Sequence, residues 1–159
     1  MTIIDTERLR LRPWNRSDAP ALYELAKEPR IGMACGWRPY TCIDDAYDGL
    51  STVLAAPESY AVTLRESNEL VGAIALRMKA ADQRNVADLG YWTGRPYWGN
   101  GYATEAGRAI VDRAAHLGYA TLTLSYFEGN EASRRVAHSS DSRGRGAKRA
   151  WSSPSSASV

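Results

Sequence analysis

The sequence predicts a single α/β domain built around a mixed β-sheet, and three observations support this. Strand-like and helical runs follow one another over residues 1–137 in the order β-α-α-β-β-β-α-β-α. A chain of 159 residues is long enough for one domain with a substantial core. Its composition, 44% hydrophobic and 24% charged, is that of a globular protein. We therefore expect one domain over 1–137, followed by a tail over 138–159.

The first elements are read from hydrophobic periodicity and from residues that start or stop helices. Leu9, Leu11 and Pro13 alternate with Arg8, Arg10 and Arg12, which predicts a first strand with one solvated face. Ser17 is the expected N-cap of a helix over 18–27, which Pro29 ends, and residues 31–40 are expected to form a loop. The remaining predicted elements are a helix capped by Thr41 with its apolar face over 43–54, strands over 60–65, 70–78 and 86–93, a helix over 103–117, a strand over 121–127 and a helix opening at 130–137.

The tail has a different composition from the domain. Residues 138–159 contain eight serines and a net charge of +3, from Arg143, Arg145, Lys148 and Arg149 against Asp141. Because the whole chain carries +2, the domain itself is left with −1. The basic balance therefore gives no reason to expect a nucleic-acid surface on the domain, and the tail is expected to be disordered.

Cysteine usage and hydropathy exclude several classes of protein. Cys35 and Cys42 lie close together with no further cysteine and no neighbouring histidine, so we expect two reduced thiols and no metal site. No apolar run approaches membrane-spanning length, and the N-terminus lacks the apolar segment of a signal peptide. We expect a cytoplasmic protein that does not engage a membrane.

The segment Gly94–Ala106 is the strongest candidate binding element. It connects the strand predicted over 86–93 to an amphipathic helix, and Gly99 and Gly101 stand at the junction. Glycine lets backbone N–H groups approach a ligand closely, and the first turn of a helix adds unpaired N–H groups and a positive dipole end. Such a turn is suited to a phosphate group.

Three other interpretations of the glycine turn are a Walker phosphate loop, a dinucleotide-binding motif and a connection that binds no ligand. A Walker phosphate loop would need Lys and Ser/Thr where Asn100 and Gly101 stand. A dinucleotide-binding motif would need glycine at Thr104 and a position after the first strand, whereas three predicted strands precede this one. A connection that binds nothing would also account for the glycines.

The flanking sequence favours one phosphate-bearing ligand. The segments Leu89–Trp92, Tyr97–Ala106 and Asn130–Val136, together with the opening Thr6–Trp14, resemble the GNAT superfamily of acetyl-CoA-dependent N-acyltransferases. Within it, the match is to the branch typified by the ribosomal-protein N-terminal acetyltransferases (RimJ/RimL-type), and it covers about residues 4–137. The resemblance implies a GNAT-like, mostly antiparallel mixed sheet flanked by helices, with acetyl-CoA as co-substrate and no metal.

The resemblance also implies which residues hold coenzyme A. Its diphosphate would bind backbone N–H groups of the turn, and its pantetheine arm would pair with the strand end, where two strands splay. Asn130 and Ser133 match the family's Asn-x-x-Ser, which contacts the arm. The expected cofactor-binding residues are Trp92, Thr93, Trp98, Gly99, Asn100, Gly101, Tyr102, Ala103, Thr104, Asn130 and Ser133.

Two side chains are candidates for proton transfer. The resemblance implies Ser133 as the donor to the departing thiolate, and Asp88, on the strand over 86–93 where relatives often place a carboxylate, as the candidate base that takes the amine proton through water. A surface serine and a solvated strand aspartate are the alternative interpretations. The tyrosine that many relatives use as the acid is replaced by Ala137. The expected partner is a primary amine on a peptide N-terminus or a small molecule; a homodimer stays open.

The resemblance ends after Ala137. Relatives continue with Leu-Gly-Phe and two further strands, whereas this chain continues with His138–Arg143. One set of codons for those residues, read from the third base of the preceding codon, encodes Gln-Leu-Gly-Phe-Gln, so we hypothesise a frameshift that the gene's nucleotide sequence would test. We expect a domain without its last two strands, an exposed edge at the strand over 121–127, and impaired activity. The rival function is a non-catalytic coenzyme A-binding protein.

Overall fold

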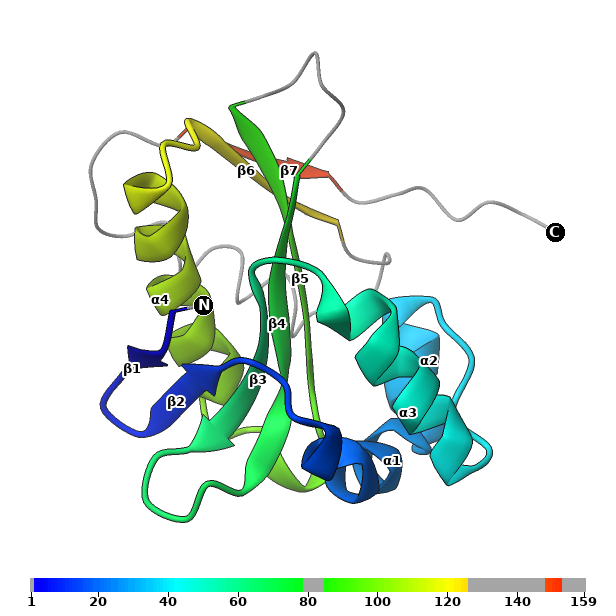
Figure 1. Ribbon diagram of the computed structural model, residues 1–159. Helices are drawn as coiled ribbons and strands as arrows, with labels where there is room; N and C mark the ends of the chain where they lie inside the picture. Colours follow the sequence, from blue (N-terminus) through cyan, green and yellow to red (C-terminus); the bar gives the residue numbers. More distant parts are fainter. Residues whose placement is uncertain (1, 79–84, 126–147, 153–159) are drawn as a thin grey trace, which may run out of the picture.

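The computed structural model describes residues 2–78, 85–125 and 148–152, in which seven strands form one sheet in the order of the sequence (Figure 1). The strands are β1 (Ile4–Asp5), β2 (Leu9–Arg12), β3 (Ser59–Leu64), β4 (Leu70–Met78), β5 (Val86–Thr93), β6 (Thr121–Ser125) and β7 (Lys148–Ser152). The helices are α1 (Ala19–Ala26), α2 (Pro29–Cys35), α3 (Ile43–Ser51) and α4 (Tyr102–His116), with short 3₁₀ turns η1 (Arg16–Asp18), η2 (Val53–Ala55) and η3 (Arg95–Tyr97).

The pairing of neighbouring strands changes once along the sheet, from antiparallel to parallel. Strands β1 to β5 are antiparallel to their neighbours, as in a meander. Helix α4 then carries the chain back, so that β6 lies parallel to β5, and β7 lies parallel to β6. The crossover therefore places the start of α4 next to the end of β5.

Helices cover both faces of the sheet, with α4 on one side and α1 to α3 on the other (Figure 1). Successive strand residues point to opposite faces, so each strand contributes to two cores. In β5, Ala87 and Leu89 pack in the cluster that contains Ile110 of α4, whereas Trp92 packs in the cluster that contains Leu22 of α1. The candidate functional site lies at the end of β5, beside the start of α4.

Most elements agree with the sequence analysis. The strands predicted over 70–78 and 86–93 are confirmed with unchanged bounds, and β3 and β4 pair as an antiparallel hairpin. The strand β2, the helix α1 and the long helix α4 are confirmed within a few residues of their predicted bounds. The two-residue strand β1 was not predicted.

The loop expected over 31–40 is wrong in its first half, which forms α2. Pro29 stands at the first position of this helix, where its fixed φ and its missing N–H are both compatible with helix formation. The Glu28 side chain accepts a hydrogen bond from Arg30 N at 3.3 Å, and Gly36 ends the helix in the left-handed conformation, with φ of 76°. The proline therefore separates two helices and begins the second.

Two predicted caps are also corrected. The residue before α1 is Asp18, at the end of η1, and the capping box of η1 is formed by Asn15 and Asp18 instead of Ser17. Helix α3 begins after Cys42. The Asp45 carboxylate accepts from the backbone N–H groups of Thr41 and Cys42, at 2.7 and 3.2 Å, so an acid in the first turn performs the capping expected of the threonine.

The segment 148–152, predicted to belong to a disordered tail, forms β7 beside β6. The expectation that β6 would be the exposed edge and that no strand would follow it is therefore wrong for this segment. A strand edge offers backbone N–H and C=O groups to any extended segment, whatever its side chains. The helix predicted over 130–137 lies outside the described residues.

Candidate functional site

The last four residues of β5 form one wall of the candidate site. The ladder between β5 and β6 runs from Val86 to Leu89 on β5, while the ladder to β4 continues to Thr93. Gly94 N donates to Val71 O at 2.7 Å. Because antiparallel backbone groups alternate in direction, Trp92 directs its N–H and C=O toward β4, and Thr93 directs its own away from β4. Residues after Ser125, which would pair with the end of β5, lie outside the described part of the chain, so the expected divergence of the two strands stays a prediction.

The turn after β5 contains two left-handed glycines. After η3, Gly99 has φ of 79° and Gly101, the N-cap of α4, has φ of 78°. No described atom lies within 4 Å of a Cβ added at Gly99, so its need for glycine comes from the backbone conformation and not from crowding. The Asn100 side chain donates to Tyr97 O at 3.0 Å and closes the turn on itself.

Side chains fasten the turn to the strands on both sides. Trp98, whose side chain is 47% exposed, donates from Nε1 to Thr93 O at 2.7 Å and so ties the turn to the end of β5. Tyr97 donates from its hydroxyl to Glu69, in the hairpin between β3 and β4. Burial and this hydrogen bond raise the pKa of Tyr97 to about 12, so the phenol stays protonated at neutral pH.

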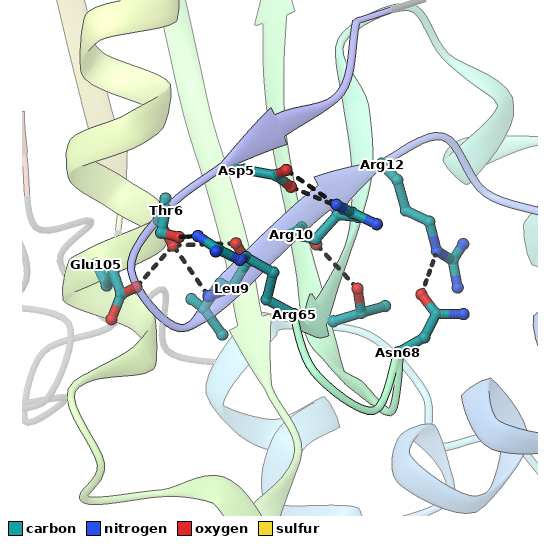
Figure 2. Close-up of polar contacts among 9 residues, drawn as sticks. Asp5, Thr6, Leu9, Arg10, Arg12, Arg65, Asn68 and Glu105 are labelled. Atoms are coloured by element: carbon teal, nitrogen blue, oxygen red, sulfur yellow. Dashed lines mark hydrogen bonds and ion pairs between the residues drawn. The ribbon is translucent and has the colours of Figure 1, made fainter.

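The start of α4 leaves backbone donors available. No described side chain caps this end of the helix, whose first residues are Tyr102, Ala103 and Thr104. Glu105, in the first turn, directs its carboxylate toward the segment before β2, where its Oε1 accepts from Thr6 Oγ1 at 2.6 Å (Figure 2). The carboxylate is occupied by these partners and does not cap the helix, so the first N–H groups and the positive dipole end of α4 can serve an anion.

A small cavity adjoins these elements. It is lined by the start of β4, by the end of β5 and by the first turn of α4, including Trp92, Thr93, Tyr102 and Ala103. Gly72 of β4 also lines it, and a Cβ there would collide with the Trp92 carbonyl oxygen. The strand end Trp92–Thr93 and the helix start Tyr102–Ala103, both predicted as binding residues, therefore line one cavity.

Asp88 is the predicted catalytic residue that lies within the described part of the chain, and it stands near the start of β5, away from the glycine turn. It is opposite Arg77 of β4 and beside Thr123 of β6, whose hydroxyl donates to Asp88 Oδ1 at 2.7 Å. At about 3.3 Å per residue, Asp88 is about 13 Å along the strand from Trp92. The two share one face of the sheet, because they are an even number of residues apart. Asn130 and Ser133 lie outside the described residues.

Sequence reasoning missed a polar contact that reaches this turn from the start of the chain. Arg8 donates from Nη1 to Asn100 O at 2.8 Å and from Nε to Glu105 Oε2 at 2.7 Å. Its guanidinium carbon lies 4.7 Å from the centre of the Tyr102 ring. In the sequence, Arg8 is one of three alternating arginines, and the alternation predicts a solvated strand face for all of them.

An aromatic cluster lies behind the end of β5. The rings of Trp37 and Trp92 are 6.2 Å apart in an edge arrangement, and Trp37 and Tyr40 are 5.6 Å apart. Cys35 Sγ lies 3.9 Å from the Tyr91 carbonyl oxygen, and burial raises the pKa of the Cys35 thiol. Both cysteines are free thiols, as predicted.

No three His, Cys, Asp or Glu side chains of the described residues are grouped so that they could hold a metal ion. None of the helices in the described ranges has the length and apolar character needed to cross a membrane.

A meander closed by a crossover helix, with a glycine turn at the start of that helix, is a fold that this chain shares with solved acetyltransferases. The chain belongs to the GNAT acetyltransferase family, whose domain model matches residues 8–142. The resemblance stated from the sequence is thereby confirmed.

Individual relatives share the fold over most of their length. An uncharacterized N-acetyltransferase of Bacillus licheniformis, p20, is 28% identical over 134 residues, which are 80% of this chain and 72% of p20. A GNAT-family acetyltransferase of Bacillus anthracis superposes with a TM-score of 0.79 at 21% identity, covering 91% and 86% of the two chains. RimL, the ribosomal L7/L12 α-N-protein acetyltransferase solved with coenzyme A, superposes with a TM-score of 0.74 at 21% identity, covering 88% and 83%.

Proposed function

We propose that the chain transfers an acetyl group from acetyl-CoA to a primary amine on a peptide N-terminus or a small molecule. The observation that carries the proposal is the uncapped start of α4, which follows two left-handed glycines and adjoins the end of β5. Family membership supports the reaction class. RimL, with the same fold, was solved with coenzyme A.

The proposed binding residues divide between two parts of the co-substrate. Backbone N–H groups of the turn from Gly99 to Gly101 and of the first helical residues, Tyr102 to Thr104, would hold the diphosphate, because they combine unpaired donors with the helix dipole. The Trp98 N–H donates to Arg95 O at 3.2 Å, so Trp98 would border the diphosphate without lending this donor. The pantetheine arm would lie along Trp92 and Thr93, where Thr93 directs its backbone N–H away from β4. Asn130 and Ser133 complete the proposed set.

The proposed chemistry is transfer of an acyl group between sulfur and nitrogen. Bound acetyl-CoA supplies a thioester carbonyl; as the amine attacks, a C–N bond forms, the C–S bond breaks, and the thiolate takes up a proton. A strand N–H in the Trp92–Thr93 segment would stabilise the charge that develops on the carbonyl oxygen. Asp88, about 13 Å along β5 from Trp92, would receive the amine proton through a chain of waters, and Ser133 would donate the proton to the thiolate.

Binding and turnover test the two halves of the proposal separately. Calorimetry should show that coenzyme A binds the protein, and acetyl-CoA with a panel of amines and N-terminal peptides should release free thiol. Asp88→Asn should lower kcat by about 100-fold, the order expected for a lost general base, with unchanged affinity for coenzyme A. Ser133→Ala should lower kcat in the same way.

The second candidate is a coenzyme A-binding protein without transferase activity. Ala137 favours it, because many relatives carry a tyrosine acid at the matching position. Binding of coenzyme A without thiol release above the uncatalysed rate, over the whole amine panel, would support this candidate. No binding of coenzyme A would exclude both.

A further inference from the structure

The segment between β1 and β2 meets the turn that precedes α4 through a dense set of polar contacts. Glu105 accepts from Arg8 N at 2.8 Å, from Arg8 Nε at 2.7 Å and from Thr6 Oγ1 at 2.6 Å. Thr6 Oγ1 in turn accepts from Leu9 N at 3.0 Å, and Arg65 donates to Thr6 O at 2.9 Å (Figure 2). The β1–β2 hairpin is therefore held in place by hydrogen bonds that do not involve the turn.

Arg8 is the member of this set that reaches the turn itself. Its Nη1 donates to Asn100 O, between the two left-handed glycines, and its guanidinium carbon lies over the Tyr102 ring. Its Nη2 would lie 3.5 Å from a Cβ at Gly101. One planar side chain thus contacts the residue before the N-cap, the space beside the N-cap and the first residue of α4.

The charges explain why an arginine is needed there. Glu105 places a carboxylate in the first turn of α4, near the donors proposed to bind a diphosphate, and two anionic groups in one place repel each other. Arg8 neutralises the carboxylate in an ion pair at 2.7 Å, and the Glu105 side chain is only 17% exposed. Burial acts to raise the pKa of Glu105, but the hydrogen bonds from Thr6 and Arg8 outweigh it and hold the pKa below its usual value.

We infer that Arg8 is a positioning residue for the diphosphate of the donor: it fixes the Asn100–Tyr102 backbone and screens Glu105 from the bound anion. This inference rests on the proposed function, since it assigns a role within the same site. Arg8 acts through the turn and has no part in proton transfer.

A truncated donor separates this role from a general structural one. Acetyl-CoA carries the diphosphate, whereas S-acetyl-pantetheine has the same thioester and arm without it. Arg8→Ala should raise KM for acetyl-CoA by about tenfold, the effect of one charge-assisted hydrogen bond, with kcat unchanged. KM for S-acetyl-pantetheine should stay within about twofold of the unaltered protein. Arg8→Lys keeps the charge but loses the planar fork, and should recover part of the affinity.

Two matched controls come from the same chain. Arg10→Ala breaks the ion pair with Asp5 in the same hairpin, at 2.7 Å, without touching the turn (Figure 2). Arg113→Ala breaks the ion pair between α4 and Glu58, at 2.8 Å, near the other end of the helix. Both should leave KM for acetyl-CoA unchanged in the folded protein.

The outcomes distinguish the inference from the proposed function. If the unaltered protein binds coenzyme A and Arg8→Ala binds it equally well, or if both donors lose affinity alike, Arg8 has no positioning role for the diphosphate. Should Arg8→Ala fail to fold, the same comparison is made with Arg8→Lys and Glu105→Gln, which must then shift KM for acetyl-CoA without shifting that for S-acetyl-pantetheine. Failure of the unaltered protein to bind coenzyme A overturns the proposed function and this inference with it.

Discussion

Helix α4 is tied to the sheet near both ends by an arginine–glutamate pair, and the two pairs differ in what surrounds them. Near the N-terminus, Arg8 and Glu105 pair beside an uncapped helix start and a turn with open backbone donors. Toward the C-terminus, Arg113 donates to Glu58 from Nε and Nη2, at 3.0 and 2.8 Å, beside the fully buried Tyr60. The first pair borders a candidate binding site, and the second borders the core.

The second pair holds a backbone that has an intrinsic cost. Glu58 has φ of 58°, a conformation that costs a residue other than glycine about 1–2 kcal/mol. Leu76 N donates to Glu58 O at 3.0 Å, and the Tyr60 hydroxyl donates to the Glu58 carboxylate. Burial and this bond raise the pKa of Tyr60 to about 12. The same ion-pair chemistry thus stabilises the fold near one end of α4 and, as we propose, prepares a ligand site near the other.

The largest expected effect is on stability, near the C-terminal end of α4. Glu58→Ala leaves the Arg113 guanidinium and the buried Tyr60 hydroxyl without their acceptor and should cost about 3 kcal/mol of unfolding free energy. Urea titration measures it, and coenzyme A affinity of the folded protein should not change. A loss below about 1 kcal/mol would show that the pair contributes little.

Two glycines that flank α4 give a matched comparison of the two ends. Gly101 has φ of 78° and Gly118 has φ of 88°, so alanine is strained at both and should cost about 1–2 kcal/mol of stability at each. Gly101→Ala should in addition lower affinity for coenzyme A by at least about tenfold, because it distorts the proposed diphosphate turn. Equal affinities of the two variants, measured by calorimetry, would contradict the assignment of the turn.

The two glutamates predict an acid limit to stability. Hydrogen bonds from Arg113 hold the pKa of Glu58 below its usual value near 4.5, and the pKa of Glu105 is lowered by the net effect described above. A depressed carboxyl pKa contributes stability above the unfolded value and loses it as pH falls through the folded value. Unfolding free energy should therefore decline below about pH 4.5. Glu58→Gln and Glu105→Gln should each flatten that decline, and an unchanged slope would argue against the corresponding pair.

The smallest expected effect concerns Trp98. Trp98→Phe removes the indole donor to Thr93 O and keeps an aromatic ring at a half-exposed position. It should cost about 1 kcal/mol in unfolding free energy. Affinity for coenzyme A should fall by less than that of Gly101→Ala, because the left-handed glycines remain. A larger loss of affinity than for Gly101→Ala would move the binding role from the backbone to the indole.

The sequence predicted what depends on local periodicity and missed what depends on distant contacts. The bounds of β4 and β5 follow from runs rich in strand-forming residues between polar connections, and the two glycines marked the start of α4. Helix α2 was missed because Pro29 was interpreted as an end, although it also favours the first position of a helix. Strand β7 was missed because its pairing with β6 depends on an open edge, which no local composition records.

The candidate site divides in the same way. Its turn and strand end were predicted by residue number, and of these residues Trp92, Thr93, Tyr102 and Ala103 line one cavity, while their role in binding stays a prediction. The roles assigned to Asp88 and Ser133 stay predictions. Arg8 was not identified, because its contact with Glu105 joins residues 97 positions apart and nothing in its neighbourhood distinguishes it from Arg10.

That separation has a consequence for how the site assembles during folding. A contact across 97 residues closes a long loop, whose entropic cost must be met by the rest of the fold. A fragment that contains β5, the glycine turn and α4 lacks the hairpin that holds Asn100 and Glu105. We therefore expect the turn to reach its final shape only after the β1–β2 hairpin has met the start of α4. Any binding competence should then appear late in folding, together with the sheet.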